Sequence, residues 1–212
     1  AFNTNKNRSF NLDESDLVAL SAVRRGKVPL VVQVDRAADI IKVVTAFGSY
    51  PALRLVLASA TEAWKVAPLL KADNIPVLIN VMENLPQNFD RLGARLDQAT
   101  LLAEAGVRFA FFSGSPYSET RSLSQAAGIA VAQGLSWQQA ITAITAAPAE
   151  IWGLKGLGRI EVGAIADLVI WNGDPLEVTS APVAVLIDGA RVDLETRQDA
   201  LAKRYVELLN LK

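Results

Sequence analysis

The stretch PLVVQVDRAADIIKVVTAF, residues 29–47, decides how the N-terminal part of the chain folds. Its first six residues are almost all apolar and rich in β-branched side chains, a pattern typical of a strand buried on both faces of a parallel sheet. Residues 37–47 then carry apolar side chains at helical spacing, namely Ile40, Ile41, Val43 and Val44. The stretch therefore predicts a strand followed by a helix.

The same pattern recurs along the next part of the chain. Apolar runs at 53–58, 76–80 and 108–112 predict three further strands, and helical spacing is seen at 62–70 and 92–105. Strands that alternate with helices predict a parallel sheet. Four such units are half of a (β/α)8 barrel, which normally needs about 250 residues. We therefore predict an α/β fold, a partial TIM (β/α)8-type barrel of about four β/α units.

Capping residues mark where the predicted helices begin and end. The residues that carry this signal are Asp13 before a helix that stops at Gly26, Thr61 before the helix at 62–70, Gly106 after the helix at 92–105, Ser136 before a helix at 137–146, and Pro148 at the start of a short helix at 149–153.

Composition excludes several classes of protein. The chain is 51% hydrophobic and 20% charged, with a net charge of -1. It has no cysteine and no basic stripe of the kind that binds nucleic acid. Its apolar runs are shorter than the ~20 residues of a membrane-spanning helix. We expect a soluble protein of the cytoplasm or periplasm, with neither nucleic acid nor membrane as a partner.

The character of the chain changes after Gly153. A glycine-dense connector leads to apolar runs at 166–172 and 183–188, which predict strands of a separate small sheet, and a terminal helix is predicted at 196–209. We predict three parts: a half barrel over 1–153, strands of a small composite β-domain over 154–195, and the terminal helix over 196–212.

Three motifs in the second half resemble those of the amidohydrolase superfamily, in particular its imidazolonepropionase-like and prolidase-like branch. They are ITAAPAEIWGL at 144–154, GRIEVGAIADLVIWNGDPL at 158–176 and VLIDG at 185–189. The middle motif is similar to the family's passage from barrel to small β-domain, where Asp167 is expected to brace the strand that follows. All three are structural motifs and contain no catalytic residue.

The resemblance implies a metal-dependent hydrolase of carbon–nitrogen bonds, with zinc or another divalent metal held at the strand ends. The family's ligands are histidines from an early H-x-H and from the fifth and sixth strands, and an aspartate after the eighth strand is ligand and proton shuttle. If the four predicted strands are the fifth to the eighth, these positions fall on Gln33, Ser59 and Gly114. All 212 residues contain no histidine, so we expect no metal cofactor from this chain.

This mismatch leaves three functional hypotheses open. The first is a catalytically impaired amidohydrolase, a pseudoenzyme that binds a small amide-like ligand or pairs with an active paralogue. The second is an active hydrolase whose atypical metal site is completed by a missing N-terminal half. The third is a non-catalytic binding or structural subunit. We expect the barrel to be completed by that missing half or by a second chain, and the protein to form a homo-oligomer.

Several polar residues are expected near the strand ends, where barrel enzymes bind their substrates. Asp35, Glu62 and Glu83 are candidates for a magnesium or calcium site. Alternatively, Asp35 pairs with Arg36 or another cation and Glu62 belongs to a first helical turn. Serines without a histidine partner do not predict a serine hydrolase. The full set of candidate pocket residues is Gln33, Asp35, Arg36, Ser59, Glu62, Glu83, Asn84, Ser113, Gly114 and Ser115.

Overall fold

The computed structural model describes residues 13–83, 85–113 and 122–210. The chain divides into two compact units, residues 1–155 and 156–212. No helix of the described part is long and apolar enough to cross a membrane.

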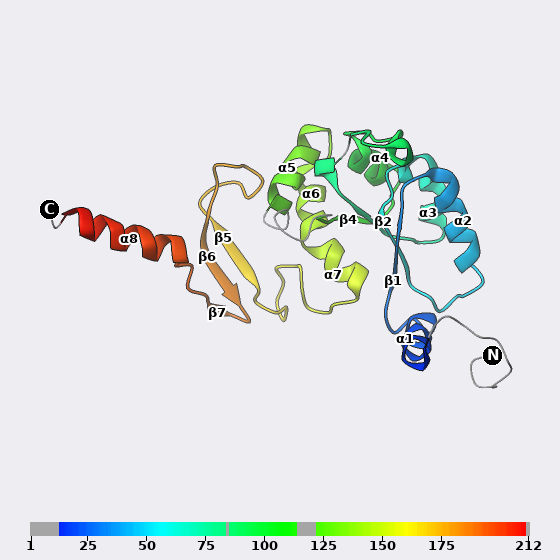
Figure 1. Ribbon diagram of the computed structural model, residues 1–212, viewed down its shortest axis with the longest axis horizontal. Helices are drawn as coiled ribbons and strands as arrows, with labels where there is room; N and C mark the ends of the chain where they lie inside the picture. The colour runs from blue at the N-terminus through cyan, green and yellow to red at the C-terminus, as the bar shows by residue number, and fades with distance from the viewer. Residues whose placement is uncertain (1–12, 84, 114–121, 211–212) are drawn as a thin grey trace. The chain divides into compact units, whose positions relative to one another are not determined.

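The first unit is built on a parallel sheet of four strands in the order β1-β2-β3-β4 (Figure 1). The strands are β1 (Leu30–Val34), β2 (Leu55–Ser59), β3 (Val77–Ile79) and β4 (Phe109–Phe111). Val34 at the end of β1 lies beside Ser59 at the end of β2. The four predicted strands are therefore confirmed, and because they are parallel their carboxyl ends meet at one edge of the sheet.

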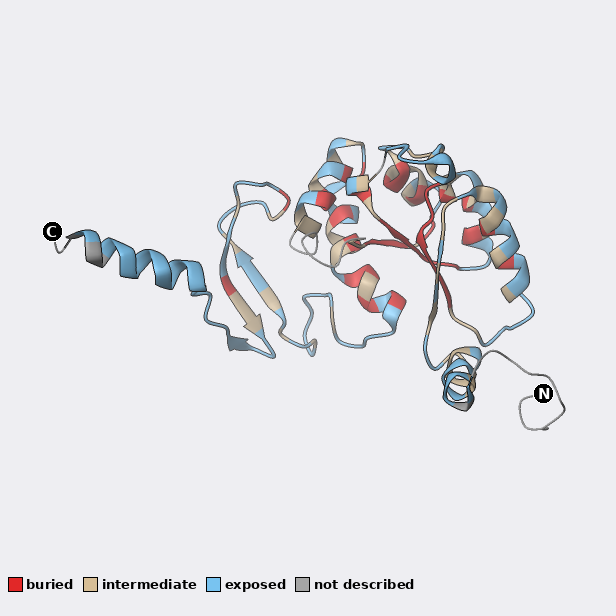
Figure 2. Cartoon of the chain, viewed as in Figure 1, coloured by how far each residue is buried: buried red, intermediate tan, exposed pale blue. Residues whose placement is uncertain are grey.

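Helices cover the two faces of this sheet. On one face, Leu57 of β2 and Ile79 of β3 are completely buried, as are side chains of α2 (Ala37–Phe47), α3 (Ala67–Ala72) and α4 (Gln98–Glu104). On the other face, Val56, Ala58, Leu78 and Ala110 form a cluster with Ala147 and Ile151 of α7 (Ala146–Trp152). Figure 2 shows the buried residues gathered along the strands and on the helix sides that face them. The continuously apolar strands thus form the core.

The predicted helix starts are partly confirmed. Helix α1 (Glu14–Arg24) begins with a capping box between Asp13 and Asp16, and Gly26 has the positive φ of 71° expected of a residue that ends a helix. Helix α6 (Trp137–Ile144) begins with a capping box between Ser136 and Gln139. Helix α2 has the predicted bounds.

The single helix predicted at 62–70 is wrong, because the structure has two shorter helical segments there. A 3-10 turn, η1 (Ala63–Val66), comes first, and α3 begins only at Ala67. Pro68 explains the break, because proline cannot donate the backbone hydrogen bond that a continuous helix needs there, whereas the first turn of α3 tolerates it. Thr61 is not the N-cap; its hydroxyl donates to Asp35 instead.

The remaining helices differ from the prediction at their ends. Helix α4 starts at Gln98 rather than at 92, after a separate turn η3 (Phe89–Arg91); Gly93 lies between the two and disfavours a continuous helix. Helix α7 starts at Ala146, with Pro148 inside its first turn, and ends at Trp152 before Gly153. Helix α5 (Leu123–Ala132) was not predicted, because its alanine-rich sequence lacks a clear apolar stripe.

The second unit contains a small antiparallel sheet in the order β5-β6-β7 and a terminal helix. Its elements are β5 (Leu168–Trp171), β6 (Pro182–Ile187), β7 (Ala190–Arg191) and α8 (Arg197–Asn210). The Asp167 carboxylate accepts a hydrogen bond of 2.8 Å from the Asp188 backbone N–H, in the turn between β6 and β7. Asp167 therefore braces the start of β5, as predicted from the motif.

Candidate functional site

The candidate site lies where the carboxyl ends of β1 and β2 meet. Asp35 follows β1 directly, and Ser59 is the last residue of β2. The Ser59 hydroxyl donates to Asp35 Oδ1 over 2.6 Å, and the Thr61 hydroxyl donates to the same oxygen over 2.6 Å. The two predicted candidates Asp35 and Ser59 are thus in direct contact, and Thr61 is a site residue that the sequence analysis assigned to a cap.

The Asp35 carboxyl group is held in its charged form. Burial acts to raise its pKa, but the hydrogen bonds from Ser59 and Thr61 and the nearby positive charge of Arg91 outweigh that effect, so the pKa lies below its usual value. Its side chain is only 14% exposed. Asp35 is therefore a carboxylate at neutral pH.

Arg91 is the central residue of the site, and the sequence analysis did not identify it. It is the last residue of η3, in the segment that joins β3 to α4. Its Nε lies 3.4 Å from Asp35 Oδ2, its Nη1 donates to Glu83 Oε2 over 2.8 Å, and its Nη2 donates to Ser59 Oγ over 3.2 Å. All three guanidinium nitrogens therefore contact the site.

The charge on Arg91 is reinforced by its partners. The hydrogen bond to Glu83 raises the pKa of Arg91, burial acts in the opposite direction, and Asp35 raises it further. Arginine is already protonated at all ordinary pH values. The site therefore holds a permanent positive charge between two carboxylates.

Arg36 has a different role from the one considered in the sequence analysis. Its Nε forms an ion pair with Asp90 Oδ1 at 3.0 Å, and its Nη2 donates to the Phe89 carbonyl over 3.2 Å. Asp35 pairs with Arg91, a cation distant in sequence, rather than with Arg36. Both arginines thus fasten the η3 turn to the ends of the strands.

Glu62 accepts a hydrogen bond from the first turn of α2, a neighbouring helix. Its Oε2 accepts a hydrogen bond of 2.9 Å from the Ala37 backbone N–H at the start of α2, and its Oε1 pairs with Lys65 at 2.6 Å. Burial acts to raise the pKa of Glu62, but these contacts with Ala37 and Lys65 lower it overall. Negative charge at a helix N-terminus is stabilising. Glu62 therefore belongs to the packing of α2 and does not share the cluster around Arg91.

The backbone at the end of β2 is in an unusual conformation. Ser59 has φ 66° and Ala60 has φ 44°, both in the left-handed region that residues with a Cβ rarely adopt. The buried Gln98 side chain donates from Nε2 to the Ala60 carbonyl over 2.8 Å. Left-handed residues other than glycine cost of order 1–3 kcal/mol each and concentrate at functional sites. Gln98 is a further site residue that no sequence motif indicated.

The other predicted site residues are less informative. Gln33 on β1 is exposed, and Ser113 is half-buried just after β4. Asn84, Gly114 and Ser115 lie outside the described residues.

The residues at the strand ends do not fit the divalent metal that the resemblance implies. In the described ranges, no three or more His, Cys, Asp or Glu side chains gather into a group that could hold a metal ion. The Ser59 hydroxyl contacts Asp35 and the Arg91 guanidinium, so its surroundings already contain a cation. Gln33 and Ser59 are also poor ligands for zinc compared with the imidazoles that zinc sites use.

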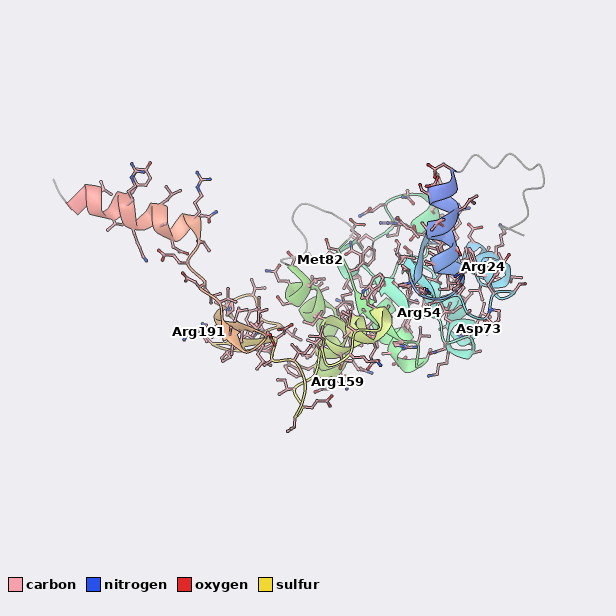
Figure 3. The ribbon with its side chains drawn as sticks, turned by 90° about the horizontal axis from the view of Figure 1, so that it is seen from below. Arg24, Arg54, Asp73, Met82, Arg159 and Arg191 are labelled. Atoms are coloured by element: carbon pink, nitrogen blue, oxygen red, sulfur yellow. The ribbon has the colours of Figure 1, made fainter. Side chains whose placement is uncertain are left out.

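A cavity lies at the opposite end of the strands. It has a volume of about 540 Å3 and is lined by residues that precede β2, β3 and β4, including Arg54, Asp73 and Arg108. Figure 3 labels Arg54 and Asp73 there. Arg54 Nη2 donates to the Ile151 carbonyl near the end of α7 over 2.8 Å. Parallel barrels bind substrates at the carboxyl ends of their strands, so this cavity is not the candidate site.

Comparisons with known proteins agree with the motifs. A family model described as the amidohydrolase family matches residues 99–193. The amidohydrolase tasK of Hapsidospora irregularis is 36% identical over 90 residues, which are 42% of this chain and 9% of that protein.

Solved structures extend the similarity to the first half of the chain. An amidohydrolase from Thermotoga maritima MSB8 matches 89% of this chain and 49% of its own, with 26% identity and a TM-score of 0.79. A prolidase complexed with N-methylphosphonate-L-proline matches 87% of this chain and 50% of its own, with 21% identity and a TM-score of 0.65, and shows the fold alone. The partial barrel fold is thus confirmed, and the chain spans about half the length of these solved structures.

Proposed function

Because the chain belongs to the amidohydrolase superfamily, we propose that it comes from a catalytically impaired member, a pseudoenzyme whose strand ends are held by ion pairs instead of a metal. One observation carries this proposal: the Arg91 guanidinium donates to Ser59 Oγ over 3.2 Å. Ser59 is the position where the resemblance expects a metal-binding histidine on the sixth strand. A side-chain cation therefore contacts the residue that stands at the family's expected ligand position, where a metal ion would otherwise bind.

Electrostatic repulsion prevents the Arg91 guanidinium and a divalent metal ion from binding side by side at the strand ends. At an effective dielectric constant of 20, two unit charges 4 Å apart interact by about 4 kcal/mol, so a divalent ion beside the guanidinium would be opposed by about 8 kcal/mol. Asp35 and Glu83 already form ion pairs with Arg91. Arg91 would have to leave before a divalent metal could bind these carboxylates.

The proton-transfer step is also affected. The resemblance expects an aspartate at the position of Gly114, where it would move a proton between water and the leaving group. Glycine has no side chain to do this, and a general base must lie within hydrogen-bond reach of the proton that it takes. Asp35, which is held as a carboxylate by Ser59, Thr61 and Arg91, has its oxygens engaged in these contacts.

We propose that such a protein binds a small amide-like molecule. This proposal is supported by the solved prolidase of the same fold, which is complexed with N-methylphosphonate-L-proline. A ligand of this kind that binds the full-length protein should raise its melting temperature. The absence of any shift with a panel of dipeptides and cyclic amides would contradict this part of the proposal.

A second candidate function is an active hydrolase whose metal site is completed by sequence outside this chain. It is favoured by the length comparison, since the chain covers only 49% of the Thermotoga maritima amidohydrolase. In this alternative, Asp35 and Glu83 would exchange Arg91 for a metal held mainly by other residues. The two functions differ in metal content and in their response to chelation.

The sheet itself supports completion by further protein. Among the strands that the structure describes, β1 forms an edge of the sheet, and Val31 and Gln33 on it are exposed. The Leu30 N–H donates to the Arg54 carbonyl, and successive N–H groups along a strand alternate between its two edges, so those of Val31 and Gln33 face the open edge. We propose that a further strand from the rest of the polypeptide or from a second chain pairs there. Slow hydrogen exchange of these two amides in the full-length protein would support the pairing, and fast exchange would contradict it.

Metal content and activity test the main proposal. The full-length protein, expressed with added zinc and manganese, is analysed for bound metal and assayed against dipeptides and cyclic amides with and without a chelator. We expect less than stoichiometric metal and no turnover that a chelator abolishes. Stoichiometric metal together with chelator-sensitive turnover would overturn the proposal in favour of the second function.

Two aspartate variants locate any metal that is found. Asp35→Asn removes the strand-end carboxylate, and Asp39→Asn removes an exposed carboxylate on α2 that pairs with Lys42. Metal that is lost from Asp35→Asn but kept by Asp39→Asn would be bound at the strand ends. Metal kept equally by both variants, without turnover that a chelator abolishes, would be bound elsewhere and would leave the proposal intact.

A further inference from the structure

Arg91 reaches the site from a turn that is itself exposed. In η3, the Phe89 side chain is 81% exposed and no residue of the turn is buried. Leu92, directly after it, is 63% exposed. The Arg91 side chain, in contrast, is only 15% exposed. The guanidinium therefore points inward from a segment that contributes little to the apolar core.

Polar contacts hold this segment in place. Besides the contacts of Arg91, these include the Arg36 pair with Asp90 and the Arg36 bond to the Phe89 carbonyl. Trp64 adds a hydrogen bond of 3.0 Å from Nε1 to the Gly93 carbonyl, and the Arg95 guanidinium lies over the Trp64 ring, 5.0 Å from its centroid. Segments with few buried apolar contacts open locally at a lower free energy than the core. We call residues 85–97 the strand-end flap and expect it to open at a lower free energy than the sheet.

Two of the acceptors beneath Arg91, Asp35 and Ser59, are also held by contacts that do not involve it. The hydroxyls of Ser59 and Thr61 fix Asp35 Oδ1, which leaves Oδ2 directed at the Arg91 Nε. Glu83 Oε2 and Ser59 Oγ meet the other two nitrogens. Three acceptors thus surround a flat group with fixed donor directions. A guanidinium matches such an arrangement, whereas an ammonium group is a compact point charge without this geometry.

We infer that Asp35, Glu83 and Ser59 form a guanidinium-binding site, that Arg91 is its tethered occupant, and that an external ligand enters it by opening the strand-end flap and replacing Arg91 with a planar cation of its own. The inference rests on the proposed function in one respect, namely that no metal occupies these carboxylates. It adds the chemical class of the group recognised here, a guanidinium or amidinium group on the ligand. It also assigns Arg91 a positioning role, in which the arginine keeps the flap closed when no ligand is bound.

Chemical rescue tests the inference. Arg91→Ala in the full-length protein removes the tethered group, and methylguanidinium at low millimolar concentration, far below denaturing levels, is titrated by calorimetry and by melting temperature. We expect saturable binding and a raised melting temperature for Arg91→Ala, with binding about tenfold tighter than that of methylammonium because of the extra charge-assisted hydrogen bonds. The wild type should show no saturable binding at the same concentrations.

Arg95→Ala is the matched control. Arg95 lies in the same flap, but it pairs with Asp97 near the surface at 2.7 Å and does not contact Asp35, Glu83 or Ser59 in the described contacts. Methylguanidinium should not rescue this variant. Equal responses of the two variants, or no binding to Arg91→Ala, would overturn the inference. Binding of zinc but not of methylguanidinium by Arg91→Ala would also overturn the inference. If the wild type is free of metal in the same experiment, the proposed function still stands.

If Arg91→Ala does not fold, the double variant Arg91→Ala with Glu83→Gln removes one of the two carboxylates left without a partner. Asp35 and Ser59 remain in it, so methylguanidinium should still bind and still be preferred over methylammonium, although more weakly than in the single variant. No preference between the two cations in this folded variant would overturn the inference.

Discussion

Arg91 Nε lies 3.4 Å from Asp35 Oδ2, although 56 residues separate them in the sequence. The contact joins the end of β1 to the turn that precedes α4, and the same guanidinium reaches Ser59 at the end of β2. The charge pair thus links the first and third β/α units across the carboxyl end of β2. Stability, acid sensitivity and flap motion should all depend on it.

Arg91→Ala should destabilise the protein by about 3 kcal/mol, near the lower end of the range for breaking a buried ion pair, because Asp35 and Glu83 lose their cation while largely shielded from water. Arg95→Ala, which breaks an exposed ion pair with Asp97 and a cation–π contact with the Trp64 ring, should cost only about 1 kcal/mol. Urea unfolding at pH 7 measures both variants. Equal losses in the two would show that Arg91 is not the stabilising centre of the strand ends.

Asp35→Asn should lower stability at neutral pH by about 2 kcal/mol, because charge-assisted hydrogen bonds are replaced by neutral ones. The folded-state pKa of Asp35 is lowered, so its contribution is fully present above the unfolded-state pKa of about 3.9 and is lost as the pH falls through the lower folded-state pKa. The difference between wild type and Asp35→Asn should therefore be constant from pH 7 to 5 and shrink below about pH 4.

Unfolding curves at pH 7, 5, 4 and 3 measure this difference. Asp39→Asn, which breaks an exposed pair with Lys42, should change stability at pH 7 by less than about 0.5 kcal/mol. A difference between wild type and Asp35→Asn that grows on acidification would contradict the assignment of Asp35 as a low-pKa carboxylate.

The sheet could be predicted from the sequence because each of its strands is marked locally. Runs such as 29–34 and 53–58 are apolar throughout, and a strand that is buried on both faces needs no partner information to be identified. Helix ends with a capping residue or a glycine, such as Asp13 and Gly153, were also placed well. Helix α5 was missed because alanine-rich sequence buries a face without showing a strong apolar stripe.

The candidate site was only half predictable. Asp35, Ser59 and Glu83 follow strands, so topology alone brings them to one edge of the sheet. Arg91 and Gln98 come from an irregular segment and from the start of α4, and their side chains reach the site through contacts that no local spacing encodes. The sequence analysis also assigned Thr61 to a helix cap, since the same hydroxyl can bind either a backbone N–H or a carboxylate.

Gln98→Leu should destabilise the protein by about 1 kcal/mol, because the buried Ala60 carbonyl loses one hydrogen bond. The leucine side chain has nearly the same shape as the glutamine that it replaces. The loss is small because the Ala63 N–H still donates to that carbonyl over 2.8 Å. Gln138→Leu, at an exposed position of α6, is the control and should change stability by less than about 0.5 kcal/mol. Thermal unfolding checks both, and a loss above about 3 kcal/mol would indicate that Gln98 has a larger role than this bond.

Arg91→Ala should also make the strand-end flap open more often, because the flap loses the contacts that fasten it to β1 and β2. Amide hydrogen exchange in residues 85–97 should become at least about tenfold faster, while exchange in α2 and α3 changes less. Arg108→Ala removes an arginine that bonds to Asn74 at the other end of the sheet, and it should leave exchange in the flap unchanged. Faster exchange spread evenly over the whole unit would contradict a local role for Arg91.

The most direct test of the central claim, that an arginine takes the place of the metal at these strand ends, is anomalous X-ray diffraction from crystals of the full-length protein grown with zinc. The account predicts the Arg91 guanidinium between Asp35, Glu83 and Ser59, and no anomalous peak within bonding distance of these residues. A zinc peak bound to Asp35 or Glu83, with Arg91 turned away from them, would contradict it.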